Sequence, residues 1–144
     1  LYGATPFASD QPLARNLKPS MTLRSRIIAT REIEAGESVG YSAAWTAQRP
    51  SRIATVAIGY ADGYPRQAKS GTPVIVCDRV AKLAGRVSMD MLAIDITDIP
   101  EAQIGSAVEL WGERLLASAI ATYSDTVPYT LFTGITRRVH KSYI

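Results

Sequence analysis

Short stretches of alternating, branched residues dominate the chain between residues 21 and 111. The clearest stretch, residues 52–59, reads RIATVAIG and ends at a glycine. A period of two turns one face of a strand toward a core, and β-branched side chains favour that geometry. Further stretches of this kind are separated by turn-forming residues, so the sequence predicts a mostly β domain. They are residues 21–33, 38–45, 72–77, 80–85, 88–96 and 107–111.

The connections between these stretches indicate how the strands pair. Residues 34–37, EAGE, are a turn signal, so residues 21–33 and 38–45 are expected to form a hairpin. Asp78-Arg79 is expected to be a second turn. So many short strands favour a closed or nearly closed antiparallel β-barrel with Greek-key features.

The C-terminal third adds one or two short helices to the barrel. Leu115 to Tyr123 has its apolar residues at helical spacing. Another helix is expected to begin at Val127-Pro128 behind a Thr126 cap and to end at Gly134. Residues 138–144 are expected to be a last extended segment.

The N-terminal residues 1–20 differ in composition from the rest. They are rich in Pro, Ala, Ser and Gly without a clear period, so we expect a linker or the end of a preceding domain. The chain begins at Leu1 instead of Met, which suggests a piece of a longer protein. Residues 21–144 then form the β domain, and a hydrophobic content of 47% is enough for its core.

Composition excludes several classes of protein. The net charge is only +3 and the basic residues are scattered, which is not typical of nucleic-acid binding. No apolar run is long enough for a transmembrane helix, and no signal peptide is visible. One cysteine, Cys77, and one histidine, His140, make neither a metal site nor a Ser-His-Asp triad. A buried, inert Cys77 and a cytoplasmic setting are expected.

Two motifs remain as carriers of chemistry. In IGYADGYPR, residues 58–66, Tyr60 follows the end of a strand and has glycines on both sides. Functional groups concentrate in such loops, although the residues alone favour a tyrosine that packs over the strand end. In GRVSMD, residues 85–90, Met89 reads as a core filler by its side chain. Its backbone N–H could instead bind a ligand carboxylate.

The two motifs, in this order, resemble the C-terminal domain of alanine racemase. The similarity extends from Leu1 to Ile144 and keeps the order of the family's blocks. Further matching blocks are residues 19–27, 36–41, 46–49, 107–112, 129–134 and 138–139.

The resemblance implies a dimeric enzyme that interconverts L-alanine and D-alanine for cell-wall peptidoglycan. Its N-terminal α/β barrel holds pyridoxal 5′-phosphate (PLP) on a lysine, and its C-terminal domain is mostly β. PLP makes the α-proton acidic, and two acid–base groups must then act on opposite faces. The resemblance assigns one face to that lysine and the other to Tyr60 of the second subunit. It assigns a contact with the substrate carboxylate to the main chain of Met89.

The resemblance places the lysine that binds PLP in the N-terminal barrel, outside this chain, and we assign no cofactor-binding residue here, so we expect the chain to be inactive alone. A phenol with the ordinary pKa of about 10 is a poor base at neutral pH. The cation that would activate Tyr60 belongs to the other domain, so no activation is expected here. Where some family members have a tyrosine near the phosphate of PLP, this chain has Arg137, which could also meet a phosphate.

Two other interpretations stay open. The chain could be a β-barrel interaction module that only drives dimerisation. It could also belong to a related PLP enzyme with the same two-domain plan, such as an amino-acid decarboxylase or a broader racemase. Decarboxylases of that plan usually rely on a cysteine near the end of the β domain, whereas Cys77 lies mid-chain.

Overall fold

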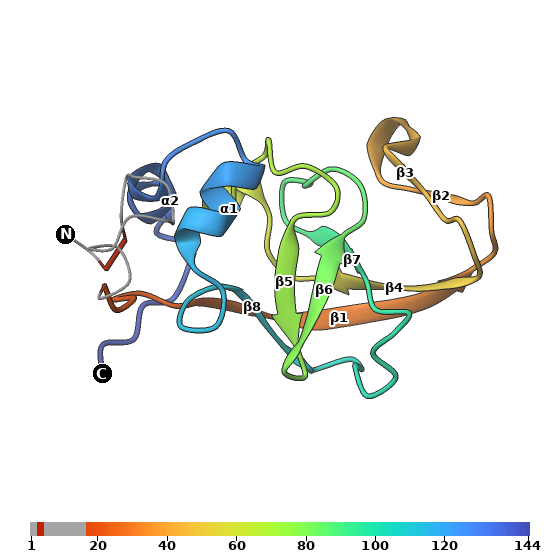
Figure 1. The fold of residues 1–144 in the computed structure, drawn as a ribbon, viewed down its shortest axis with the longest axis horizontal. Coiled ribbons are helices and arrows are strands. Elements are labelled where there is room, and N and C mark those ends of the chain that lie inside the picture. The colour runs from red at the N-terminus through yellow and green to blue at the C-terminus, as the bar shows by residue number, and fades with distance from the viewer. Residues whose placement is uncertain (1–2, 5–16) are drawn as a thin grey trace.

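The centre of the molecule is a closed β-barrel. The computed structural model describes residues 3–4 and 17–144, so most of the predicted linker lies outside the described residues. Within the described part, six strands close in the order β1-β4-β7-β6-β5-β8, and every pair is antiparallel (Figure 1). The predicted mostly β, closed-barrel fold is therefore confirmed. The strands are β1 (Leu23–Ile33), β4 (Ser51–Val56), β5 (Pro73–Val76), β6 (Arg79–Leu83), β7 (Leu92–Asp95) and β8 (Ala107–Trp111).

The topology explains the Greek-key character of the barrel. Strands β5, β6 and β7 follow one another as a meander, while the outer two pair with β8 and β4. The long strand β1 pairs with β8 along its first half and with β4 along its second half. The register shifts between Ile27 and Ala29, which bends the strand so that it serves both neighbours.

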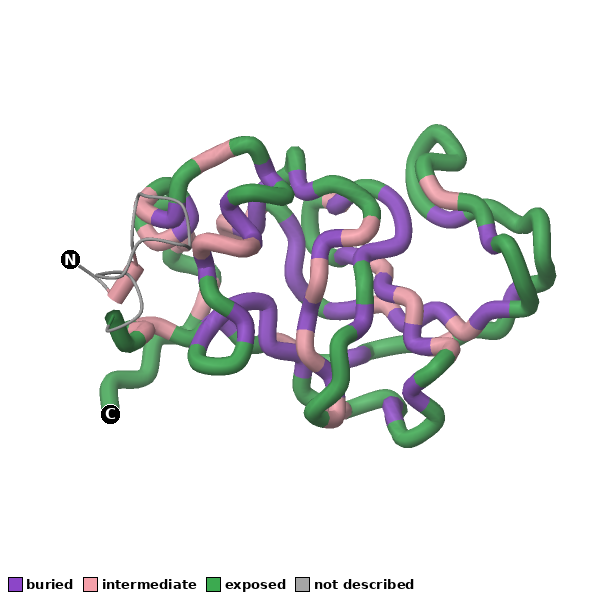
Figure 2. Tube along the Cα trace, viewed as in Figure 1, coloured by how far each residue is buried: buried purple, intermediate pink, exposed green. Residues whose placement is uncertain are grey.

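Alternation places the core inside this barrel. Val74 and Val76 of β5, Ile94 of β7 and Val108 and Leu110 of β8 are fully buried, because every second side chain of a strand faces the interior. Figure 2 shows buried residues along the barrel strands and exposed residues in most of the connecting loops. This rigid frame holds the loops that carry both motifs.

The segment between β1 and β4 corrects one prediction. The expected hairpin of residues 21–33 with 38–45 is wrong, because β2 (Ser38–Val39) pairs with β3 (Trp45–Thr46) instead. A 3₁₀ turn, Tyr41–Ala43, separates these two short strands. Gly40 has φ 82°, which ends β2 after two residues. The small sheet projects from one end of the barrel (Figure 1).

The helices lie at the other end of the molecule (Figure 1). They are α1 (Ala117–Tyr123) and α2 (Pro128–Gly134), which pack against each other. Both were predicted, but the cap was not correct. The N-cap of α2 is Val127, without a side-chain hydrogen bond, so Thr126 does not cap the helix.

Four smaller expectations also changed. Residues 138–144 form no strand, and β7 begins only at Leu92, because residues 88–91 belong to the GRVSMD loop. The turn after β5 is formed by Cys77 and Asp78, and the side chain of Cys77 is only half-buried. Among the described residues, no helix has the length and apolar character needed to cross a membrane.

Candidate functional site

The two sequence motifs meet at one edge of the barrel. The backbone N–H of Tyr60 donates to the Ser88 carbonyl at 3.0 Å, and that of Ala61 donates to the Met89 carbonyl at 3.0 Å. Tyr60 begins a 3₁₀ turn, Tyr60–Asp62, that follows the end of β4. The structure therefore brings together both residues that the sequence singled out.

Glycine makes this close approach of the two loops possible. A Cβ atom on Gly59 would lie 2.3 Å from the Met89 carbonyl oxygen and 2.4 Å from that of Ser88. No side chain fits at such distances, because real Cβ contacts begin above 3.0 Å. Gly63 ends the turn with φ 104°, a left-handed conformation that glycine adopts without strain.

An open depression with a volume of about 1010 Å³ lies over this junction. Among the described residues that line it there are three cationic side chains, Arg66, Lys69 and Arg86, and no carboxylate. An unbalanced positive lining favours an anionic ligand group. Other lining residues include Tyr41, Ala44, Tyr60, Ser70, Ser88 and Met89.

Tyr60 forms part of the wall of the depression. Its side chain is 36% exposed, and the Arg66 guanidinium carbon lies 5.6 Å from the centre of its ring. This cation–π contact covers one face of the ring. The packed interior tyrosine is Tyr64, which is fully buried and stacked on Trp111 with ring centroids 6.0 Å apart. Burial raises the pKa of Tyr64 above its usual range.

Met89 is not a core residue, since it is 53% exposed. Its carbonyl is occupied by the Ala61 N–H. Its own N–H makes no hydrogen bond within the part of the chain that the structure describes. A free backbone donor beside cationic side chains is a suitable contact for a carboxylate.

Sequence reasoning missed a second phenol on the same depression. Tyr41 is 71% exposed and lies in the 3₁₀ turn between β2 and β3. Ser42 and Ala43 beside it have φ of 59° and 49°, and such strained non-glycine backbone clusters at functional sites. A Cβ on Gly40 would lie 3.3 Å from the Arg86 nitrogen, so this turn sits directly on the GRVSMD loop.

A signal for Tyr41 was present in the sequence. Residues 36–41 are one of the blocks that match the family, and Tyr41 follows a glycine just as Tyr60 does. The contact between the turn and Arg86 is long-range, so the local pattern did not show that the two phenols share a site.

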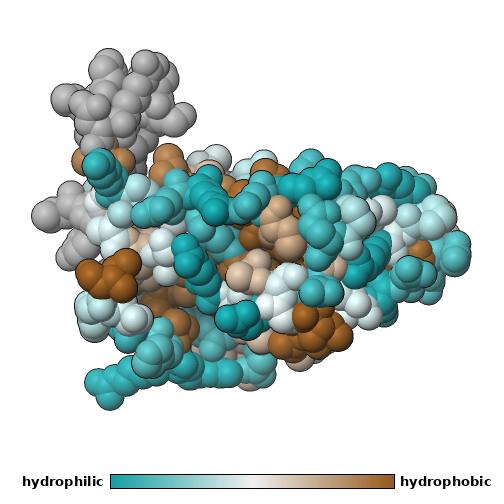
Figure 3. Space-filling view, turned by 90° about the horizontal axis from the view of Figure 1, so that it is seen from below, coloured by the Kyte–Doolittle hydropathy of each residue, from teal (hydrophilic) through white to brown (hydrophobic). Residues whose placement is uncertain are grey.

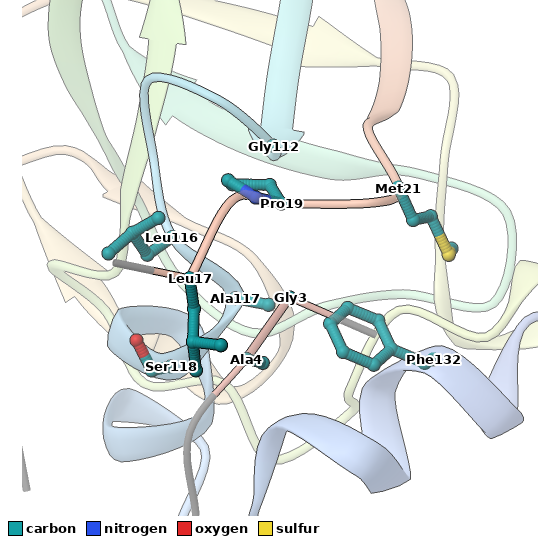
Figure 4. Close-up of a pocket in the computed structure, with 10 residues that line it drawn as sticks. All are labelled: Gly3, Ala4, Leu17, Pro19, Met21, Gly112, Leu116, Ala117, Ser118 and Phe132. Carbon is teal, nitrogen blue, oxygen red and sulfur yellow. The ribbon is translucent and has the colours of Figure 1, made fainter. Parts of the chain in front are cut away.

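Other residues of interest lie outside the depression. Arg137 and His140 are exposed and do not line it. Figure 3 shows one face of the molecule as mostly hydrophilic, with apolar residues in separate patches. A small cavity of about 30 Å³ lies by the helices and contains no charged lining residue among those described (Figure 4). Its lining includes Gly3, Leu17, Pro19, Met21, Leu116 and Phe132.

Fold and site together define a closed antiparallel barrel domain with a cation-rimmed depression that carries two accessible phenols. The family model described as "Alanine racemase, C-terminal domain" matches residues 20–143. The chain therefore belongs to the family of alanine racemase C-terminal domains.

Individual relatives agree with this assignment. The chain is 57% identical to an alanine racemase of Hahella chejuensis, over 100% of this chain and 38% of the relative. It is 55% identical to a catabolic alanine racemase of Pseudomonas putida, over 100% of this chain and 40% of the relative. The chain thus spans about two fifths of the length of the curated relatives it matches.

Solved structures show the same similarity in three dimensions. The biosynthetic alanine racemase from Pseudomonas aeruginosa superimposes with a TM-score of 0.94 at 52% identity, covering 99% of this chain and 40% of that one. The alanine racemase from Bartonella henselae with covalently bound pyridoxal phosphate gives a TM-score of 0.87 at 32% identity, covering 99% of this chain and 39% of the other.

Proposed function

We propose that this chain is the C-terminal β domain of a PLP-dependent alanine racemase and supplies a tyrosine acid–base group to the active site of a second subunit. The observation that carries the proposal is the depression where both family motifs meet, with exposed phenols at its edge. The names of the relatives and the PLP in one similar structure support it. The product, D-alanine, would serve peptidoglycan synthesis in the cytoplasm.

The lining of the depression fits the substrate side of such a site. PLP, when bound, makes the α-proton of the amino acid acidic. Three cations and a free Met89 N–H would attract and orient the substrate carboxylate. The covalent bond to PLP would be made by a lysine outside this chain. The residues of this chain would therefore only bind the substrate and move protons.

In this proposal a phenol oxygen carries out the proton transfer. Racemisation needs a proton removed from one face of the α-carbon and another delivered to the opposite face, so two groups must flank the substrate. The Oη atom of a tyrosine from this chain would take the proton of L-alanine. It would return a proton to the same face when D-alanine is the substrate.

Tyr60 and Tyr41 are both candidates for this role. The sequence motif assigns it to Tyr60, whose ring is partly covered by Arg66. Tyr41, which is 71% exposed, is a second phenol that lines the same depression, so it is tested beside Tyr60.

The experiment that tests the proposal replaces each phenol in the full-length protein. Tyr41→Phe and Tyr60→Phe are assayed for racemisation in both directions. The variant that has lost the acid–base group is expected to lose about 10²–10⁴-fold in rate, while the other keeps most of its kcat. If both variants retain the wild-type rate, the chain supplies no acid–base group and acts only as a dimerisation module.

A further inference from the structure

A cluster of charges joins three segments beside the site. Arg138, on the segment after α2, lies between carboxylates of both motif loops: its Nε is 3.3 Å from Asp62 Oδ1, and its Nη2 donates to Asp90 Oδ1 at 2.6 Å. We name these three residues the Arg138 cluster. The hydrogen bond with Asp90 and the field of Asp62 raise the pKa of Arg138, so its charge persists across the physiological pH range.

Each carboxylate of the cluster is close in sequence to a residue of the site. Asp62 lies two residues after Tyr60, and its second oxygen accepts the Gly59 N–H at 2.9 Å. Its side chain is only 15% exposed. Asp90 directly follows Met89. The guanidinium therefore spans the distance between the loop that presents Tyr60 and the loop that presents Met89.

The segment that carries Arg138 is also held to the Tyr60 loop by hydrogen bonds of Thr136 that do not involve the guanidinium. The Thr136 N–H donates to the Asp62 carbonyl at 3.0 Å, and the Thr136 hydroxyl donates to the Ala61 carbonyl at 2.9 Å. Removing the guanidinium would therefore break the two ionic contacts while leaving the backbone of the segment in place. Asp62 is mostly covered, but Arg138 and Asp90 are each about half-exposed, so the contribution of the cluster to stability is expected to be small.

We propose that Arg138 is a positioning residue of the racemase site, one that sets the spacing and orientation of the Tyr60 and Met89 loops. This inference rests on the proposed function. The planar guanidinium fork can engage two carboxylates at once, whereas a lysine ammonium is a point charge that cannot reproduce the fork. A shift of about 1 Å in substrate position can lower an enzyme's rate about a hundredfold.

The test compares Arg138→Ala and Arg138→Lys in the full-length enzyme with a matched control, Arg49→Ala. Arg49 pairs with Asp98 at 2.5 Å, is equally half-exposed, and does not line the depression. We expect kcat/KM of Arg138→Ala to fall about tenfold to a hundredfold, chiefly through a higher KM for alanine, because the Met89 N–H loses its alignment. Arg138→Lys stays impaired, and Arg49→Ala has the wild-type kcat/KM.

Melting temperatures and a double-mutant cycle separate positioning from folding. Arg138→Ala is expected to melt at the same temperature as Arg49→Ala, and its effect on KM to be non-additive with that of Asp90→Asn. Wild-type kcat/KM in Arg138→Ala, or full rescue by Arg138→Lys, overturns the inference while the proposed function stands. A wild-type enzyme without racemase activity overturns both.

Discussion

Replacing Gly59 by alanine should separate the two motif loops. The new Cβ would lie 2.3 Å from the Met89 carbonyl oxygen, whereas ordinary contact begins at 3.4 Å, so the backbones must move apart by roughly 1 Å. Such a movement breaks the hydrogen bonds of Tyr60 and Ala61, both 3.0 Å long. Each lost bond costs about 1 kcal/mol and the overpacking about 1–3 kcal/mol. The free energy of unfolding should fall by about 3–5 kcal/mol.

Urea unfolding followed by tryptophan fluorescence, to which the buried Trp111 contributes, measures this loss. The matched control is Gly134→Ala, whose Cβ would meet only the Gly63 oxygen at an ordinary 3.7 Å. Gly134 lies in α2, where alanine favours the helix by up to about 1 kcal/mol, so the control should be neutral or stabilised. A Gly59→Ala chain that unfolds at the wild-type urea concentration would refute the argument that the loops touch through this glycine.

Two further predictions concern a buried phenol and the cofactor. Burial raises the pKa of Tyr64, whose hydroxyl has no partner among the described residues. The unfolded chain releases this proton near pH 10 and the folded chain retains it, so the free energy of unfolding should fall as pH rises above about 10. Urea titrations at alkaline pH should show a smaller fall in Tyr64→Phe. The same fall in both proteins would contradict the role given to the Tyr64 hydroxyl. The 144-residue chain alone should develop no visible absorbance of a lysine-bound PLP, and a saturable band would show that one of its own lysines binds PLP.

Local patterns were sufficient where an element's own residues determine it. Residues 107–111 form β8 as predicted, and all of them except Ala107 are buried. The limits of α2 followed from Pro128 and Gly134, which suit the first turn and the end of a helix. The strand predicted over residues 38–45 was wrong, because positive φ angles at Gly40, Ser42 and Ala43 break it. These angles occur where the turn packs on the backbone of Arg86. No local pattern contains that contact.

In the site, too, the sequence predicted the features that depend on local residues and missed those that depend on long-range contacts. The glycines around Tyr60 indicated a close approach of two backbone segments, and in the structure the Met89 backbone lies beside Gly59. Tyr41 and Arg138 were not singled out, since each joins the site through residues far away in the sequence. Side-chain positions that depend on tertiary contacts need the fold before they can be assigned.

The central claim is that a phenol of this chain handles the α-proton on one face of alanine. The most direct measurement follows the exchange of that proton in D₂O, separately for L-alanine and D-alanine, with full-length Tyr41→Phe and Tyr60→Phe. One of these variants should still exchange the proton of D-alanine while exchange of L-alanine is lost. Exchange of both enantiomers at the wild-type rate in both variants would contradict the account.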